Sequence, residues 1–147
     1  MLKLYKLIWN KSTLSNLNLE LETWLEVLRR HDFSKILEIP SNLIENSIWE
    51  EAAEEMRNLT FCKTPSETLN SIVKSITMIS RAYSLLSETG DDVTADDILQ
   101  LVSYVILRSS VSQLYTHILY VKALNYEPES EQSGIKTYCI RSLEIAL

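Results

Sequence analysis

Residues that break helices are scarce in this sequence. Only two glycines and three prolines stand among its 147 residues. A β fold of this length needs many tight turns, which glycine and proline supply, so their scarcity favours long helices. Apolar residues make up 46% of the chain, enough to exclude a disordered or fibrous protein and to form the core of one domain.

Apolar side chains recur at steps of three and four residues along most of the chain, which is the spacing of a buried helix face. One such stripe, from Leu14 to Leu28, predicts a helix of about 16 residues. A broken connector ends at Pro40, and a second stripe runs from Ile48 to Leu59. The sequence predicts an all-α, layered helical bundle of about six to seven helices, with residues 1–147 as a single domain.

The best-marked helix begins after Thr64, which is the predicted N-cap. Pro65 takes the first helical position, and Glu67 completes a capping box. We expect this helix to be broken at Gly90. Its predicted buried face comprises Leu69, Ile72, Val73, Ile76, Ile79, Tyr83 and Leu86.

Two adjacent acids, Asp96 and Asp97, stand directly before the next apolar run. Thr94 has the position of an N-cap, and Asp97 follows it at the capping-box spacing. Asp96 is then left on the first helical turn, free to point outward. Because apolar residues cover most of its circumference, we expect this helix to be central. Those residues are Ile98, Leu99, Leu101, Val102, Val105 and Ile106.

Two more helices are predicted in the C-terminal part of the chain. Val111, Leu114, Ile118 and Val121 mark an amphipathic helix. An acidic loop over residues 125–134 separates it from a final helical stretch over residues 136–147. We expect Tyr138 to be exposed at the junction before the final helix, and the tyrosines at positions 104, 115, 120 and 126 to be packed. The chain begins and stops within helical patterns, which predicts a domain truncated at both ends.

Charge and cysteine content exclude several classes of function. A net charge of −6 speaks against a nucleic-acid partner, which requires a basic surface. Cys62 and Cys139 are far apart and no secretory signal precedes them, so reduced thiols are expected. With only His31 and His117 besides, we expect no metal site and no cofactor. No apolar run is long enough to span a membrane, and the chain has the pattern of a cytoplasmic protein.

The first eleven residues, "MLKLYKLIWNK", combine apolar side chains with Lys3, Lys6 and Lys11. Such a segment can lie on a membrane surface. A first bundle helix is favoured, because the polar face is short and the whole protein is acidic.

Bond-breaking chemistry finds little support in the sequence. It has no nucleophile elbow, no phosphate-binding glycine loop and no histidine-rich cluster. Asp96 and Asp97 cannot flank one bond, because neighbours on a helix point about 100° apart.

Three segments carry a resemblance to a known family. "TADDILQLVSYVILRSS", "LYTHILYVKAL" and "TYCIRSLEIAL" resemble, in this order, motifs of the vacuolar protein sorting 9 domain. Upstream, "LYKLIW", "LEVLRRHDFSKILEIP" and "KTPSETLNSIVKSITMI" are similar to its earlier helices. The family is all-helical and comprises guanine nucleotide exchange factors for early-endosomal Rab GTPases, the Rab five subfamily. The resemblance therefore implies a Rab partner and an endosomal role.

The resemblance also implies roles for individual residues. Asp96 matches an aspartate that is pushed like a finger into the nucleotide pocket of the GTPase, and Tyr138 matches a tyrosine that packs against the GTPase switch region. We expect these two side chains to share one face. The other expected partner-binding residues are Leu99, Ser103 and Ile140, lining a shallow groove, with Gln100 and Arg141.

Several positions depart from the family pattern. Gln100 stands where the family usually has a proline, so the direction in which Asp96 projects can differ. The other departures are Ser110 and Val111 for the family's Asn-Pro, Thr137 for its glycine and Arg141 for its threonine. Two functions are therefore weighed first: a Rab exchange factor, or a weak or silent relative that serves as a Rab-binding or trafficking-complex interaction module. A third, a structural helical domain unrelated to GTPases, would be favoured by an Asp96 that is buried and ion-paired.

Overall fold

The regular structure of this chain is helical. The computed structural model describes residues 12–44, 47–87, 94–124 and 131–147, and these contain no strand. Six of their helices have ten or more residues: α2 (Ser12–Arg29), α5 (Ile48–Arg57), α6 (Pro65–Leu86), α7 (Ala95–Ser109), α8 (Leu114–Leu124) and α9 (Glu131–Ala146). Three shorter elements connect them: α3 (Phe33–Ile36), α4 (Ser41–Ile44) and the 3₁₀ helix η1 (Asn58–Phe61). The predicted all-α fold is confirmed.

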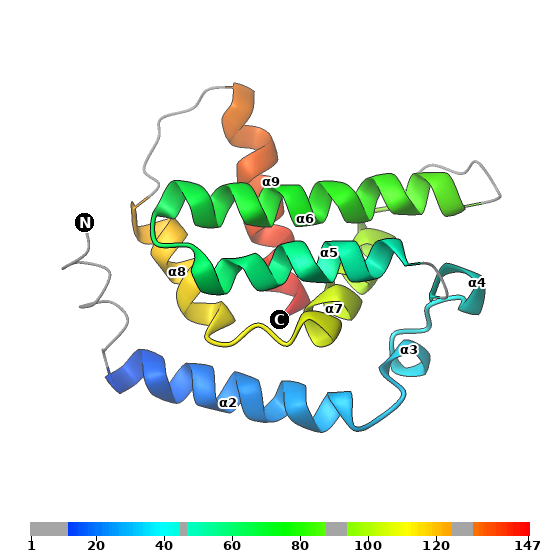
Figure 1. Cartoon of the computed structure of the whole chain (residues 1–147), viewed down its shortest axis with the longest axis horizontal. Helices are drawn as coiled ribbons and strands as arrows, with labels where there is room; N and C mark the ends of the chain where they lie inside the picture. The colour runs from blue at the N-terminus through cyan, green and yellow to red at the C-terminus, as the bar shows by residue number, and fades with distance from the viewer. Residues whose placement is uncertain (1–11, 45–46, 88–93, 125–130) are drawn as a thin grey trace.

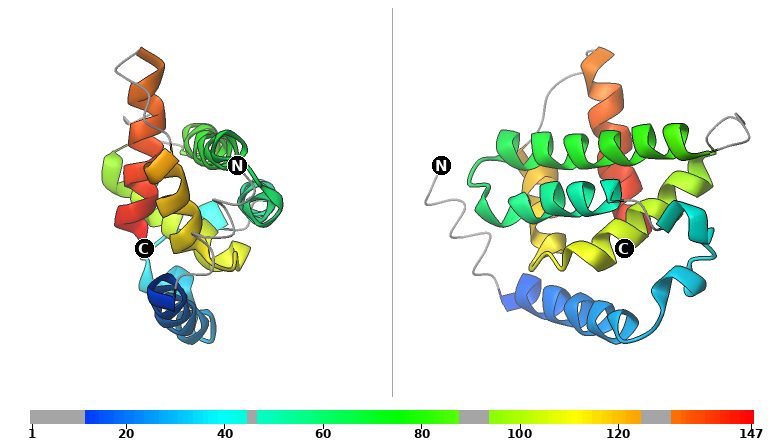
Figure 2. Two further views of the ribbon diagram at one scale, coloured as in Figure 1. Left: turned by 90° about the vertical axis from the view of Figure 1, so that its left-hand side faces the viewer. Right: turned by 45° about the vertical axis from the view of Figure 1, so that its right-hand side comes forward.

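The helices pack in layers. α5 and α6 lie side by side and antiparallel, joined through η1, and α9 crosses behind them at a steep angle (Figures 1 and 2). α7 crosses α9 obliquely and packs against α5, α6 and α9. α2 lies along the opposite edge, where it packs against α8 and α7.

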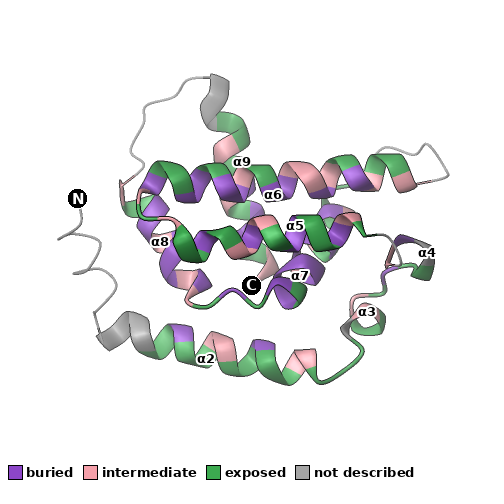
Figure 3. Ribbon diagram, viewed as in Figure 1, coloured by how far each residue is buried: buried purple, intermediate pink, exposed green. Residues whose placement is uncertain are grey.

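α7 is the central helix, as its apolar pattern predicts. Most of its residues between positions 98 and 109 are buried, and α2, α3, α5, α6 and α9 all pack against it (Figure 3). Its buried apolar side chains are Ile98, Leu101, Val102, Tyr104, Val105, Ile106 and Leu107. The core therefore fixes the direction in which the N-terminus of α7 points.

The start of α6 follows its local sequence signals. The Glu67 N–H donates to Thr64 Oγ1 at 3.2 Å, and the Thr64 N–H donates to Glu67 Oε2 at 3.1 Å, which completes the predicted capping box. On the predicted buried face, four side chains are buried and three are half-buried, the latter being Val73, Tyr83 and Leu86. α6 ends at Leu86, and Gly90 lies outside the described residues.

The final helix differs from the prediction. α9 begins at Glu131, so residues 131–134 are helical and do not belong to a loop. Tyr138 consequently lies within α9 and not at a junction before it. The polar residues 131–134 carry no apolar periodicity, and for that reason the sequence pattern alone did not reveal this part of the helix. The connector before Pro40 also contains a short helix, α3.

Polar contacts link α2 to the last turn of α7 and to the turn between α7 and α8. Arg29 Nε donates to the Leu107 carbonyl oxygen at 2.7 Å, and the Gln113 N–H donates to Glu22 Oε1 at 2.8 Å. These bonds hold α2 beside α7 and α8. Residues 1–11, for which a first bundle helix was expected, lie outside the described residues. Within the described part of the chain, no helix is both long and apolar enough to cross a membrane.

Candidate functional site

The two adjacent carboxylates in the first turn of α7, Asp96 and Asp97, differ in their hydrogen bonding. The Asp97 N–H donates to Thr94 Oγ1 at 3.2 Å, while the Thr94 N–H donates to Asp97 Oδ2 at 3.2 Å. The Thr94 hydroxyl also lies 2.5 Å from Asp97 Oδ2. These bonds to the Thr94 side chain and backbone, with a further one from the Tyr83 side chain, lower the pKa of Asp97. Asp97 is therefore a capping residue, as its spacing predicts.

Asp96 has no such partner. Its side chain is exposed, and among the described residues it makes no hydrogen bond and no ion pair. It stands in the first turn of α7, where the free backbone N–H groups of a helix attract negative charge. This carboxylate is available to a partner molecule.

A stripe of candidate residues leads from Asp96 along α7. Leu99, Gln100 and Ser103 stand three, four and seven positions after Asp96, so all four lie on one face of the helix. Gln100 is exposed, whereas Leu99 and Ser103 are half-buried. Gln100 occupies the second turn of a regular helix, without the bend that a proline imposes there.

Ser103 joins this stripe to α9. Its hydroxyl lies 3.2 Å from the Ala146 carbonyl oxygen and 3.0 Å from the Leu99 carbonyl oxygen of its own helix. The middle of α7 is thus fixed against the C-terminal end of α9. Ser103 has a packing role between the two helices that carry the candidate residues.

α9 presents an exposed apolar row that includes Tyr138. Tyr138 is 46% exposed, and two isoleucines on the same helix, Ile135 and Ile145, are 62% and 69% exposed. Spacings of three and seven residues place all three on one side of the helix. Ile135 and Ile145 were not among the predicted site residues. Their i, i+3, i+10 spacing was visible in the sequence, but it acquires meaning only when the helix is known to begin at Glu131.

Ile140 lies on a different side of α9 from Tyr138. Two positions along a helix correspond to a rotation of about 200°. Ile140 lines a hollow of about 320 Å³ between α8 and α9, together with Val121, Lys122, Thr137, Arg141 and Glu144. Leu99 and Ser103 are not among its lining residues. Ile140 therefore lines the α8–α9 hollow, which does not include the other two residues of the expected groove, Leu99 and Ser103.

Arg141 lies at the border between these two sides of α9. It is exposed and lines the α8–α9 hollow, one helical turn after Tyr138. Lys122 and Glu144, which line the same hollow, form an ion pair of 2.5 Å. Arg141 thus contributes a positive charge next to the exposed row.

The groups needed for a metal site do not come together in the described ranges. No cluster of three or more His, Cys, Asp or Glu side chains is placed there to hold an ion. Cys62 and Cys139 are free thiols, the first half-buried and the second buried.

Comparison with known families gives one match. A family model described as "Vacuolar sorting protein 9 (VPS9) domain" matches residues 49–147, well over half of the chain. No curated protein matches the chain. The matched residues include α7 and α9, which carry the candidate site, while α2 lies upstream of the match.

Proposed function

The chain belongs to the vacuolar sorting protein 9 (VPS9) domain family, and we propose that it is a guanine nucleotide exchange factor for a Rab GTPase of the early-endosomal (Rab five) subfamily. VPS9 domains accelerate GDP release without forming a covalent intermediate. The observation that carries the proposal is the state of Asp96: it is exposed and uncommitted, beside an aspartate that the helix cap fully occupies.

The chemistry of nucleotide binding explains how such a carboxylate acts. A GTPase holds GDP through a magnesium ion and through a phosphate-loop lysine that pairs with the phosphates. A carboxylate inserted into this pocket competes for the lysine, repels the phosphates and disfavours the metal. Asp96 would supply that carboxylate from the first turn of α7.

Thermodynamic coupling makes a covalent step unnecessary. A protein that binds the nucleotide-free GTPase more tightly than the loaded form weakens nucleotide binding by the same factor. GDP then leaves, and GTP enters where it is in excess. Binding energy therefore accelerates GDP release, while the excess of GTP sets the direction of exchange.

Docking energy would come from α9. The exposed row of Ile135, Tyr138 and Ile145 offers apolar area to a partner, and a large exposed aromatic is a frequent anchor of protein interfaces. In the proposed complex, Tyr138 contacts the switch region while Asp96 enters the nucleotide pocket. Leu99 and Gln100 of α7 would lie next to the entering aspartate, and Arg141 would lie next to Tyr138.

The test is the release of fluorescent GDP from a panel of Rab GTPases. The parent protein should accelerate release from an early-endosomal Rab, and Asp96→Ala should abolish the acceleration. Glu51→Ala is a matched control, because Glu51 is also an exposed acid in the first turn of a helix, α5, without a side-chain partner among the described residues. It should retain full activity.

The same panel of Rab GTPases distinguishes an exchange factor from the alternative function, an interaction module. If the parent binds a Rab without accelerating GDP release, the chain is an interaction module. An exchange factor prefers the nucleotide-free GTPase and dissociates when GTP is added, whereas an effector-like binder prefers the GTP form. In both cases we expect the protein to act in the cytoplasm, at the surface of early endosomes.

A further inference from the structure

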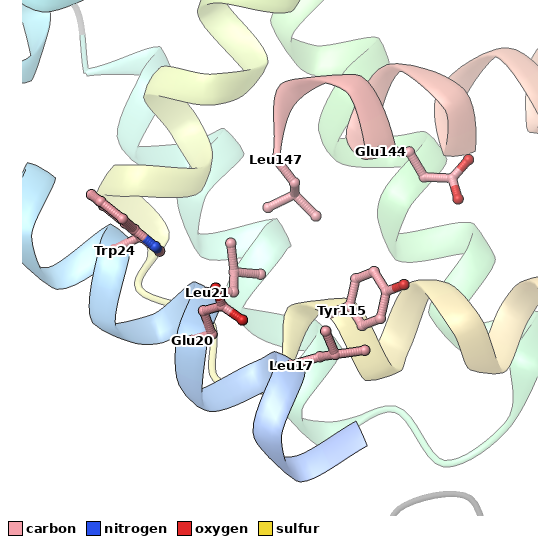
Figure 4. Close-up of a pocket in the computed structure, with 7 residues that line it drawn as sticks. All are labelled: Leu17, Glu20, Leu21, Trp24, Tyr115, Glu144 and Leu147. Carbon is pink, nitrogen blue, oxygen red and sulfur yellow. The ribbon is translucent and has the colours of Figure 1, made fainter. Parts of the chain in front are cut away.

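An apolar hollow lies where α2 meets α8 and the end of α9. Its lining residues are Leu17, Glu20, Leu21, Trp24, Tyr115, Glu144 and Leu147. Its volume is about 350 Å³, far above the roughly 30 Å³ of one water molecule. Leu21 of α2 and Leu147 point toward each other across it (Figure 4). The hollow is thus wide enough to receive a side chain of another molecule.

A second hollow, of about 450 Å³, lies on the other flank of α2. It is lined by Asn16, Leu19, Glu20, Thr23 and Trp24. Glu20 and Trp24 therefore line both hollows. Because they stand four positions apart, their side chains are neighbours on the helix surface and form one ridge between the two hollows.

The shape of this surface suits a helix. A ridge of side chains at positions i and i+4, with a groove on each side, is what helices present to one another when they pack. Leu17 and Leu21 line the groove on one side of the Glu20–Trp24 ridge, and Leu19 lines the groove on the other. A second helix laid over α2 can seat its own side chains in both grooves.

The apolar residues of this surface are largely uncovered. Leu19 and Trp24 are 64% and 63% exposed, and Leu17 is 42% exposed. An indole with most of its surface in water forgoes a large part of its burial energy. A contiguous exposed apolar surface of this kind marks an interaction site. We refer to Leu17, Leu19, Glu20 and Trp24 as the α2 surface.

The charge of the α2 surface is negative. Within the part of the chain that the structure describes, Glu20 makes no ion pair, and no Lys or Arg lines either hollow. Glu144, at the rim of the first hollow, is already paired with Lys122. Two copies facing each other through this surface would bring their Glu20 carboxylates together, and anionic lipid headgroups would meet the same charge. The complementary occupant is therefore a cationic apolar segment of another protein.

We propose that the α2 surface is a docking site for an amphipathic helix of a partner protein, which seats apolar side chains in the grooves beside Trp24 and pairs a Lys or Arg with Glu20. Trp24 is the anchor of this contact, since large aromatic side chains are frequent hot spots of interfaces. The site does not depend on exchange activity, because none of its residues belongs to the proposed exchange surface.

Fluorescence polarization with a labelled peptide tests the proposal in the full chain. The probe is a helical peptide of about 18 residues made of Leu and Lys alone, with Leu at the i, i+3, i+4 and i+7 spacing. Its isomer, in which Leu and Lys alternate, has the same charge but the period of a strand. We expect the helical peptide to bind more tightly than the isomer. Trp24→Ala should weaken this binding about tenfold or more, while circular dichroism shows an unchanged helix content of the protein.

A charge swap tests the pairing with Glu20. Glu20→Lys should weaken binding of the Leu–Lys helix and strengthen binding of the same helix made of Leu and Glu. Glu51→Lys makes the same change of net charge on the exposed surface of α5 and should do neither. Both substitutions replace exposed side chains, so both proteins should fold as the parent does.

Four results would overturn the proposal. The first is equal binding of the helical peptide and its alternating isomer, or binding of neither. The second is an equal effect of Glu20→Lys and Glu51→Lys, which would mean that only net charge matters. The third is a dimeric mass that Trp24→Ala abolishes, which would identify a second copy as the occupant. The fourth is binding to anionic lipid vesicles that Trp24→Ala abolishes, which would identify a membrane surface.

Discussion

Thr94 and Asp97 are bonded to each other in both directions at the start of α7, with each backbone N–H donating at 3.2 Å to the side chain of the other residue. This reciprocal pair accounts for one of two neighbouring carboxylates and leaves Asp96 outside the cap. The two aspartates therefore differ in what they do for the folded state, although they are adjacent in the sequence.

Alanine at each position should show this difference in stability. Asp97→Ala removes half of the capping box and should lower the free energy of unfolding by about 1 kcal/mol. Asp96→Ala removes an exposed charge without a described partner and should change it by less than about 0.5 kcal/mol. Urea unfolding followed by circular dichroism measures both. Equal losses in the two variants would show that Asp96 has a structural role and would remove the basis of the exchange proposal.

Ser110 should be replaceable with a gain in stability. It ends α7 in the left-handed region, with φ 53° and ψ 37°, which costs a serine more than a glycine or an asparagine. Ser110→Asn and Ser110→Gly should raise the free energy of unfolding by about 0.5–1 kcal/mol. Asparagine is also the residue that the family pattern has at this position.

Ser112→Gly is the control for this gain. Ser112 is exposed in the same turn but is not among the described residues with positive φ. Glycine there should leave stability unchanged or lower it. A comparable gain at both positions would mean that the left-handed backbone at Ser110 is not the cause.

His117 should make the protein sensitive to mild acid. His117 is a buried residue of α8, and this burial lowers its pKa from the ordinary 6.5 to about 4. As the pH falls below 6.5, the unfolded chain takes up a proton that the folded protein does not bind. Stability is therefore complete above pH 6.5 and is lost progressively down to about pH 4, with about 2 kcal/mol lost between pH 7 and 5.

Replacement of each histidine isolates this effect. His117→Gln should flatten the dependence of unfolding free energy on pH between 7 and 5, whatever its effect on stability at pH 7. His31→Gln changes an exposed histidine and should leave the slope as it is in the parent. A parent protein with constant stability over this range would contradict the prediction.

Tyr138 should affect docking without affecting folding. Tyr138→Ala removes an exposed side chain from α9, so the melting temperature should barely change. GDP release should slow because the complex is weaker, and a higher concentration of the variant should partly restore the rate. Ile145→Ala should behave in the same way, whereas Ile36→Ala, at a 55% exposed position on α3, should not. A loss that no concentration restores would place Tyr138 in the exchange step itself.

Local signals made much of the fold predictable. Thr64, Pro65 and Glu67 lie within four positions, and capping depends on such short-range contacts, so the start of α6 could be predicted to the residue. The same holds for Thr94 and Asp97 at α7. α3 and α4 have four residues each, which is too short for a helical period to be visible.

The features of the candidate site that depend on position along one helix could be predicted from the sequence. The features that depend on how a helix is rotated about its axis could not. The separate roles of Asp96 and Asp97 follow from their distance to Thr94. The side of α9 on which Ile140 lies depends on how that helix is rotated against α7 and α8, and long-range packing sets this rotation. The exposed positions of Ile135 and Ile145 depend on the same packing.

The burial of α7 determines which partner changes shape in the proposed reaction. Its side chains are enclosed by neighbouring helices, so the helix that carries Asp96 cannot bend or slide without opening the core. A helix held rigidly in this way has little conformational entropy to lose when a complex forms. The deformation must then occur in the GTPase, and the activation enthalpy of exchange should vary with the Rab that is used far more than with substitutions in α7 that preserve Asp96.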